Sequence, residues 1–393
     1  MSRIPAAAHP PVLWWWASLV IVRVGDHVDR WRTVSWPSVR DGAVVAGPGW
    51  AVRVAAVVDL ATSVLLLGAI GLCALPWLRT RRLHRAWDLD PPPESLLPRL
   101  SIPPGPVASL LRADLATPTT NTAITYPNGF RPAVAVLAPF FPLSRRDPEA
   151  AGFVLRHELA HAGAGDHLLS GAGSPLRALV RVIVPVGVAM AVVTQLIPDR
   201  LGEARAQTVV FVGNTLTLAL GLLAALWVAE LEADRAAAER EGARAAARSL
   251  GAGLDAGHRG LTLSHPPQRL RQWLVVRWAN PVAAAGLLLF YPLTVLARWG
   301  LLVAVALLSY SRVPDTSVSM AWSLFGDAAL ASLARSGREL VVFGVLVIAW
   351  PVLRPAWERL WLGAPGRSIA LLPGNLLGGA LCIGGGLALA TLG

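Results

Sequence analysis

Long apolar segments recur along the whole chain, and they constrain its fold more than any other feature of the sequence. Several reach the roughly 20 residues that an α-helix needs to cross the hydrocarbon core of a bilayer. Only 15% of the 393 residues are charged and 54% are hydrophobic, a balance too apolar for an ordinary soluble enzyme of this size. The sequence therefore predicts a mainly α-helical, polytopic membrane protein with about seven spans.

The apolar segments divide the chain into five consecutive parts. Three are membrane parts: N-terminal anchor segments at residues 1–78, a transmembrane hairpin at 176–229 and a group of C-terminal helices at 278–393. Two polar parts, residues 79–175 and 230–277, lie between them. The candidate spans are residues 11–24, 54–78, 178–197, 208–228, 281–308, 340–353 and 369–392.

Several of these spans carry further expectations. Residues 11–24, with three tryptophans, fit either an uncleaved anchor or an interfacial segment. Residues 281–308 fit either one long tilted helix or a hairpin broken near Arg298 and Gly300. The glycine-rich last span suits close packing between helices.

No helix breaker separates the span at 208–228 from the Ala-, Glu- and Arg-rich residues 229–250. One helix is therefore expected to leave the bilayer there and to end at Gly251 and Gly253.

The basic residues indicate the topology. All 35 are arginines, and they gather between apolar stretches, as at residues 79–85. Because cytoplasmic loops of membrane proteins carry an excess of basic residues, we expect both polar parts in the cytoplasm, with Arg354, Arg359 and Arg367 in another inside loop. This predicts a protein of a bacterial-type cell membrane, with a lipid bilayer and no nucleic acid among its partners.

The first polar part has the pattern of a small α+β unit. Residues 122–126 and 133–137 are predicted to be strands, separated by a turn that begins at Pro127. Asp147 and Pro148 mark the start of a helix that continues to His161. We therefore expect a small sheet next to this helix.

The segment from His157 to His161 reads H-E-L-A-H on the predicted helix. Its four-residue spacing places both imidazoles on one face, where they can share a metal ion, and Glu158 lies beside them as a general base for a metal-activated water. A solvated charged helix face is the alternative explanation.

A second acidic element follows the hairpin. A catalytic zinc usually has three protein ligands and an open position, and a two-histidine, one-glutamate set is established. Glu230 is the predicted third ligand, with Glu232 as its rival; Asp234 shares a helix face with Glu230 and can orient an imidazole. Alternatively, Glu230 and Asp234 pair with Arg235 and Arg240 on a solvated helix.

Taken in order, these elements resemble the membrane-integrated zinc metallopeptidases that include the CaaX prenyl endopeptidase and the HtpX heat-shock protease, which are of the H-E-x-x-H gluzincin type. The resemblance covers about residues 105–275. Its matching segments are Asn121 to Tyr126, an edge strand; Pro132 to Leu137; His157 to His161 with Asp166; Glu230 to Asp234; and Ser264 to Pro267 with Arg271.

This resemblance implies a zinc metalloendopeptidase with one zinc ion per chain, a protein or peptide substrate and a site facing the cytoplasm. It implies further that His265 and Arg271 stabilise the developing oxyanion, that Asp166 supports a ligand histidine or caps the next segment, and that the edge strand receives the substrate backbone. The alternatives are a helix-start role for His265 and a membrane-edge role for Arg271.

Two other functions fit parts of the sequence. Residues 163–169 also resemble a segment of the antibiotic-sensing receptor metallopeptidases, which cleave a repressor after a signal. A non-catalytic membrane scaffold or transporter would contain no stoichiometric zinc. The sequence does not indicate an oligomeric state.

Overall fold

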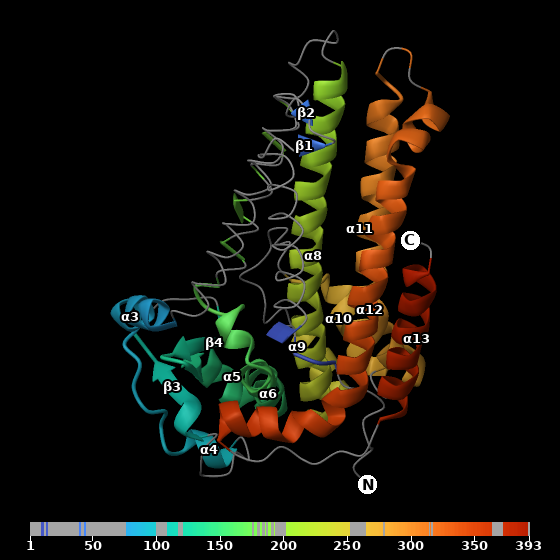
Figure 1. Cartoon of the computed structure of the whole chain (residues 1–393). Helices are drawn as coiled ribbons and strands as arrows, with labels where there is room; N and C mark the ends of the chain where they lie inside the picture. Colours follow the sequence, from blue (N-terminus) through green and yellow to red (C-terminus); the bar gives the residue numbers. More distant parts are fainter. Residues whose placement is uncertain are drawn as a thin grey trace.

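The computed structural model is mainly helical, with a small mixed sheet at one side of the long helices (Figure 1). The residues that it describes are 9–11, 13–14, 39–40, 43–44, 76–99, 108–116, 121–174, single helical positions between 177 and 192, 202–251, 265–277, 280–313, 315, 317–363 and 372–391. The predicted spans at 11–24 and 54–78, and the first span of the hairpin, lie almost entirely outside these residues.

The sheet has three strands in the order β3-β5-β4. β4 (Ala123–Asn128) pairs with β5 (Arg131–Leu137) in antiparallel register, and these two strands confirm the predicted ones. β3 (Leu111–Asp114), which was not predicted, pairs with β5 in parallel. Pro127 is accommodated inside β4 because this strand forms an edge of the sheet.

Short elements surround the sheet, and a helix packs across it. They are α3 (Pro76–Ala86), α4 (Leu96–Arg99), η1 (Ala108–Leu110), α5 (Phe140–Arg146), α6 (Pro148–Ala164) and η2 (Asp166–Leu168). The two-residue strands β1 (Val39–Arg40) and β2 (Ala43–Val44) pair with each other, apart from this sheet. Buried side chains of β3, β5, α5 and α6 form one core cluster, which includes Val134, Phe140 and Leu155.

The start of α6 is where the sequence predicts it. The side chain of Asp147 accepts a hydrogen bond from the backbone N–H of Ala150 at 3.0 Å, and Pro148 occupies the first turn. The helix ends at Gly165, whose φ of 80° is left-handed. These two signals fix the bounds of the helix that carries His157 and His161.

α8 (Gly202–Glu241) is a continuous helix of 40 residues, about 60 Å long, as the missing breaker predicts. Its predicted end at Gly251 is wrong. The helix stops at Gly242, whose φ of 89° turns the chain, and α9 (Ala243–Gly251) follows as a separate helix. α8 packs against both α6 and α11, so its lower end forms one wall of the α+β unit.

Three helices in the described part of the chain are long and apolar enough to cross a membrane. They contain the segments Ala285–Tyr310, Ser336–Leu362 and Pro373–Ala390. The helices themselves are α11 (Pro281–Tyr310), α12 (Val318–Leu362) and α13 (Pro373–Ala390), after the short α10 (Gln268–Arg277). Because α11 is unbroken, the hairpin alternative for residues 281–308 is wrong.

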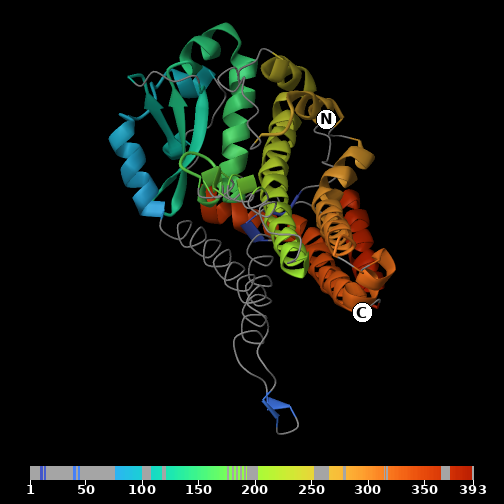
Figure 2. The same cartoon turned by 90° about the horizontal axis from the view of Figure 1, so that it is seen from above.

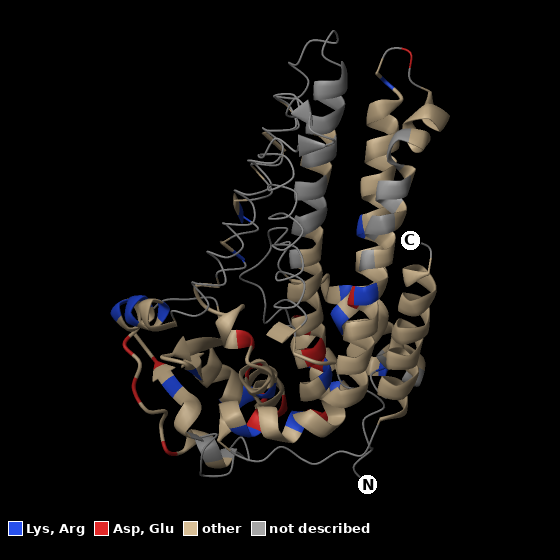
Figure 3. Cartoon of the chain, viewed as in Figure 1, with Lys and Arg blue, Asp and Glu red and all other residues tan. Residues whose placement is uncertain are grey.

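The long helices lie side by side, and the sheet and α6 lie to one side of them (Figures 1 and 2). Acidic residues gather around α6 and the lower end of α8, whereas the upper parts of α11 and α12 carry few charges (Figure 3). Close packing of the glycine-rich α13 is confirmed: a Cβ at Gly379 or Gly386 would overlap atoms of α12.

The end of α12 runs beneath α6 (Figure 1). The expected loop at Arg354 and Arg359 is wrong, because both residues are helical, and α12 continues through two internal prolines to Leu362. The indole N–H of Trp357 donates to the carbonyl oxygen of Ala164 at 2.9 Å. The last turn of α6 is therefore fastened to a helix that is a candidate membrane span.

Candidate metal centre

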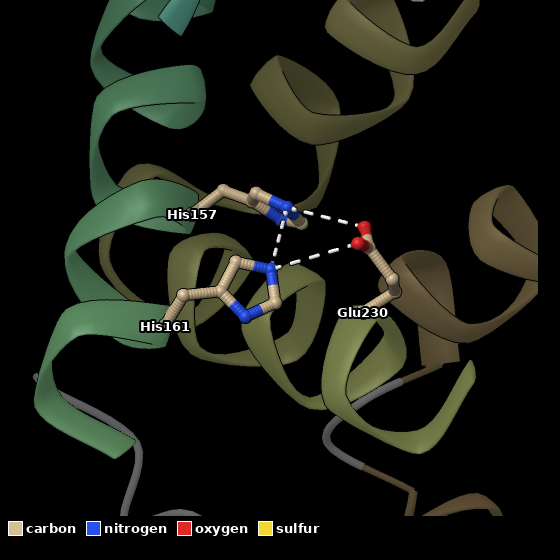
Figure 4. Close-up of side chains that lie close together, drawn as sticks. All are labelled: His157, His161 and Glu230. Carbon is tan, nitrogen blue, oxygen red and sulfur yellow. Dashed lines mark hydrogen bonds and ion pairs between the residues drawn. The ribbon is translucent and has the colours of Figure 1, made fainter. Parts of the chain in front are cut away.

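Two helices bring three metal-ligating side chains together. α6 supplies His157 and His161, and α8 supplies Glu230 (Figure 4). The two imidazole Nε2 atoms are 3.2 Å apart, and the nearest Glu230 oxygens lie 3.5 Å from His157 Nε2 and 3.9 Å from His161 Nε2. Each of the three residues is at most 8% exposed. The predicted ligands therefore converge on one buried point.

The three distances fit a small, four-coordinate metal ion. Zinc bonds of about 2.0–2.1 Å in a tetrahedral site place neighbouring ligand atoms about 3.3 Å apart, which the observed separations of 3.2, 3.5 and 3.9 Å approach. Imidazole ligands suit zinc and other transition metals, whereas magnesium and calcium prefer oxygen. The group could thus hold a metal ion.

Both imidazoles are supported on the side away from this point. Asp166 Oδ2 lies 2.9 Å from Nδ1 of His161, and Asp234 Oδ1 lies 2.9 Å from Nδ1 of His157. A carboxylate at Nδ1 fixes the ring orientation and leaves Nε2 to bind a metal. The structure therefore places Asp166 and Asp234 where the sequence analysis expects them, one beside each imidazole.

Without a metal ion, the group binds a proton strongly. Burial lowers the pKa of His157, but hydrogen bonds and charges from Asp234 and Glu230 outweigh burial and raise this pKa to about 10. Burial raises the pKa of the Glu230 carboxyl. His265, His157 and His161 outweigh burial and hold this pKa well below its usual value. Glu230 is therefore a carboxylate, ready to act as a ligand.

Glu158 is held against the edge strand. The backbone N–H and the hydroxyl of Thr125 both donate to Oε2 of Glu158, at 2.6 and 2.7 Å. Because both bonds engage the same oxygen, Oε1 stays available to accept a proton. Glu158 lines the same cavity as His157 and His161, the position that a general base requires.

This cavity runs between β4, α6 and the end of α9. Its walls contain Asn121 to Thr125, Phe153, Val154, His157, Glu158, His161, Ser170, Gly171, Arg177, Glu230, Ser249, Leu250, His265 and Arg271. The apolar residues of this lining include Phe153, Val154 and Leu250, and the charged ones include Glu158, Arg177 and Glu230.

Only part of the edge strand faces open space. Thr122 accepts a bond from Leu137, so Thr122 belongs to the β5 ladder, while Ala123 and Thr125 turn their backbone groups outward. The Thr125 N–H is bonded to Glu158, and its carbonyl accepts from the N–H of Ala172 at 3.1 Å. A peptide can therefore pair with residues 121–123, whereas the expected pairing along the whole of 121–126 is obstructed.

His265 and Arg271 differ in their relation to the metal ligands. His265 Nδ1 lies 3.3 Å from Oε2 of Glu230. Arg271 is 5% exposed and binds Asp234 through two hydrogen bonds of 2.7 and 2.8 Å. Arg271 thus contacts the carboxylate that lies beside His157, and it also lines the cavity.

Glu232, the alternative third ligand, binds Arg235 instead of the imidazoles. Arg235 is fully buried and bonds Glu232 at 2.6 and 2.7 Å, with Glu239 at 3.3 Å. Glu232 therefore turns away from the imidazoles. The alternative in which Glu230 and Asp234 pair with Arg235 and Arg240 on a solvated helix is also wrong, since both acids are buried, Glu230 beside His157 and Asp234 between His157 and Arg271.

His167 is no ligand in this arrangement. It is fully buried and its Nε2 lies 3.1 Å from the carbonyl oxygen of Phe130, outside the cluster of His157, His161 and Glu230. Burial lowers the pKa of His167 to about 4, so this imidazole is neutral.

Sequence reasoning missed three residues of the site. Thr125 positions Glu158; Arg177 lies 3.4 Å from Glu230; and Arg79, taken only as a topology signal, donates to the backbone carbonyls of His167, Leu168, Ser170 and Ala172. No local motif marks these positions. Only their distance from the H-E-L-A-H segment in space connects them with it.

Comparison of the chain with models of protein families, with curated proteins and with solved structures gives no match. A functional assignment must therefore be built from the geometry and chemistry of the site itself.

Proposed function

We propose that this chain is a membrane-embedded, zinc-dependent endopeptidase that hydrolyses peptide bonds of membrane or membrane-proximal proteins at the cytoplasmic face. The observation that carries the proposal is the convergence of His157, His161 and Glu230 in a cavity that also contains Glu158. Two histidines and a glutamate leave one coordination position open, as catalytic zinc sites require.

A zinc ion held there would lower the pKa of water and polarise a carbonyl group. The residues of the chain supply the rest. Glu158 accepts the proton of the attacking water through Oε1 while Thr125 holds its other oxygen. Asp166 and Asp234 hold the two imidazoles in the orientation that exposes Nε2.

The cavity suits an extended polypeptide. The outward backbone groups of Ala123 offer hydrogen bonds to a peptide strand next to Glu158, which gives affinity with little sequence preference. The apolar wall of Phe153, Val154 and Leu250 favours apolar side chains close to the scissile bond. Three candidate membrane spans in the same chain favour substrates that lie in or near the bilayer.

These features support membership of the family that includes the CaaX prenyl endopeptidase and the HtpX heat-shock protease. The order of elements, β4, α6 and the Glu230 segment of α8, is the order that the resemblance implies.

The test begins with elemental analysis of the purified, detergent-solubilised protein. We expect about one zinc ion per chain, lost in His161→Ala and in Glu230→Ala but retained in His84→Ala, which changes an exposed histidine of α3. Absence of zinc from well-folded wild type would overturn the proposal and favour a non-catalytic scaffold.

Proteolysis is tested with Glu158→Gln. This variant should retain zinc and lose cleavage of a mixture of fluorescence-quenched peptides by at least about 100-fold, as expected for loss of a general base. Glu149→Gln, on the exposed first turn of the same helix, is the control. Wild-type activity in Glu158→Gln would remove Glu158 as the base.

A further inference from the structure

The cavity contains a guanidinium group that the proposed function does not yet use. Arg177 follows Ser174, whose hydroxyl accepts from the Arg177 backbone N–H at 3.1 Å, and its side chain lines the cavity. Nη2 of Arg177 lies 3.4 Å from Oε1 of Glu230. Its Nε atom is buried, with no hydrogen-bond partner among the described residues.

A buried N–H group without a hydrogen-bond partner, such as Nε of Arg177, is costly unless another group accepts from it. Arginine offers five N–H donors in a planar fork, and among the described residues the side-chain contact of Arg177, to Glu230 at 3.4 Å, uses one of them. Arg177 is therefore equipped to receive a further oxygen atom that enters the cavity.

The hydrogen bonds of Arg271 differ from those of Arg177. Two of its nitrogen atoms bind the two oxygens of Asp234 at hydrogen-bond distances, so that part of its fork is occupied. Arg177 and Arg271 thus have different partners: Arg177 contacts the ligand Glu230, and Arg271 binds Asp234, the carboxylate beside His157.

The oxygen that Arg177 can receive is identified by its place. The ligand atoms of His157, His161 and Glu230 converge on one point, and Arg177 lies within 3.4 Å of one of those atoms. A carbonyl oxygen that binds beside a metal ion at that point would be within reach of the remaining guanidinium N–H groups. Negative charge develops on this oxygen during peptide hydrolysis, and fixed donors there are worth more than in water.

We infer that Arg177 is a catalytic residue that donates hydrogen bonds to the carbonyl oxygen of the scissile peptide bond as it becomes an oxyanion. The inference rests on the proposed function. Water oxygen bonds to the carbonyl carbon, the π electron pair moves to the carbonyl oxygen, and the proton of the water moves to Glu158. The C–N bond then breaks as the carbonyl re-forms, and the leaving nitrogen takes the proton from Glu158. Arg177 stays protonated throughout.

A purely supporting role for Arg177, as a cation that holds Glu230, makes a different prediction. Loss of such support would weaken zinc binding, whereas loss of an oxyanion donor would weaken binding of a tetrahedral anion and leave zinc in place. A phosphinic tetrapeptide with leucine side chains on both sides of phosphorus supplies such an anion.

The experiment uses full-length zinc-loaded protein in detergent and the variants Arg177→Gln and Arg177→Lys. The matched control is Arg181→Gln, an exposed arginine four residues further along the same helical segment, outside the cavity lining. Zinc content, the Kd of the phosphinic tetrapeptide, and kcat and KM on quenched peptides are measured for each.

We expect Arg177→Gln to retain zinc, to bind the phosphinic tetrapeptide about 100-fold more weakly and to lose a similar factor in kcat, with KM changed less than about threefold. Arg177→Lys should lie between wild type and Arg177→Gln, because it keeps the charge without the fork. Arg181→Gln should equal wild type.

Unchanged phosphinic tetrapeptide affinity in Arg177→Gln, or loss of zinc from both Arg177 variants, would overturn the inference. If the wild type cleaves peptides and Arg177→Gln does so equally well, the inference alone fails. If the zinc-loaded wild type neither binds the phosphinic tetrapeptide nor cleaves peptides, the proposed function fails, and the inference fails with it.

Discussion

Nδ1 of His157 lies 2.9 Å from Oδ1 of Asp234, and Asp234 is itself bound on both oxygens by Arg271. These contacts join α6, α8 and α10, so the orientation of the predicted ligand His157 depends on three helices. Groups behind a metal ligand fix its tautomer and raise its basicity. We therefore expect the buried Asp234 to orient His157, and a change at Asp234 to alter metal binding.

Asp234→Asn should weaken zinc binding by about 10- to 100-fold, because the carboxylate that orients His157 becomes a neutral amide. Competition with a chromogenic chelator measures the affinity. Asp88→Asn, an exposed acid after α3, is the control and should bind zinc as the wild type does. Equal zinc affinity in Asp234→Asn and wild type would show that Asp234 does not support the ligand.

Zinc affinity should rise steadily with pH between about pH 6 and 8. In the metal-free protein the pKa of His157 is raised to about 10, so a proton occupies the imidazole throughout this range and zinc must displace it. Each pH unit should therefore strengthen zinc binding by about tenfold, beyond the ordinary imidazole pKa of about 6.5. The same chelator competition, repeated across the range, measures the slope; a plateau above about pH 6.5 would contradict the raised pKa.

His167 should make the metal-free protein less stable in acid. Its folded-state pKa of about 4 lies below the ordinary value of 6.5, so the unfolded chain binds more protons between these two values. The contribution of His167 to stability is therefore complete above about pH 6.5 and falls by up to about 3 kcal/mol as the pH drops towards 4.

Thermal unfolding of the metal-free protein in detergent measures this effect. Tryptophan fluorescence is a suitable signal, because the ring of Trp361 lies 4.9 Å from that of His167. His167→Gln, which can still donate to the Phe130 carbonyl, should show a smaller drop in Tm between pH 6.5 and 4.5 than the wild type. Identical drops in the two proteins would rule out the proton uptake by His167.

Local signals made much of the site predictable. Asp147 and Pro148 set the start of α6, and with that start the spacing of His157 and His161 places both rings on one face. Glu230 was identifiable because it precedes Asp234 by four residues on a helix that no breaker interrupts. Each of these signals depends only on residues close in sequence, so it can be recognised without knowledge of the tertiary fold.

Other features depend on contacts between distant segments. β3 is four residues long and gains its stability from parallel pairing with β5, so its own sequence gives a weak signal. α8 ends at Gly242, where φ is positive, although glycines also occur inside this helix. Arg177 reaches Glu230 across 53 positions of sequence, and no spacing rule connects two such residues.

Gly171→Ala should destabilise the protein more than Gly242→Ala. Both glycines have positive φ, 75° and 89°, so each alanine strains the backbone by about 1 kcal/mol. A Cβ at Gly171 would also overlap the carbonyl oxygen of Thr125, whereas a Cβ at Gly242 meets no atom of the described residues within 4 Å. A shift of the Thr125 carbonyl would disturb the hydrogen bond that it accepts from Ala172. It would also disturb the hydrogen bond from the Thr125 N–H to Glu158. The Tm of each variant, measured in detergent, tests this. Equal decreases in Tm would mean that residues 170–172 can shift to accommodate the new Cβ and do not stabilise the edge strand.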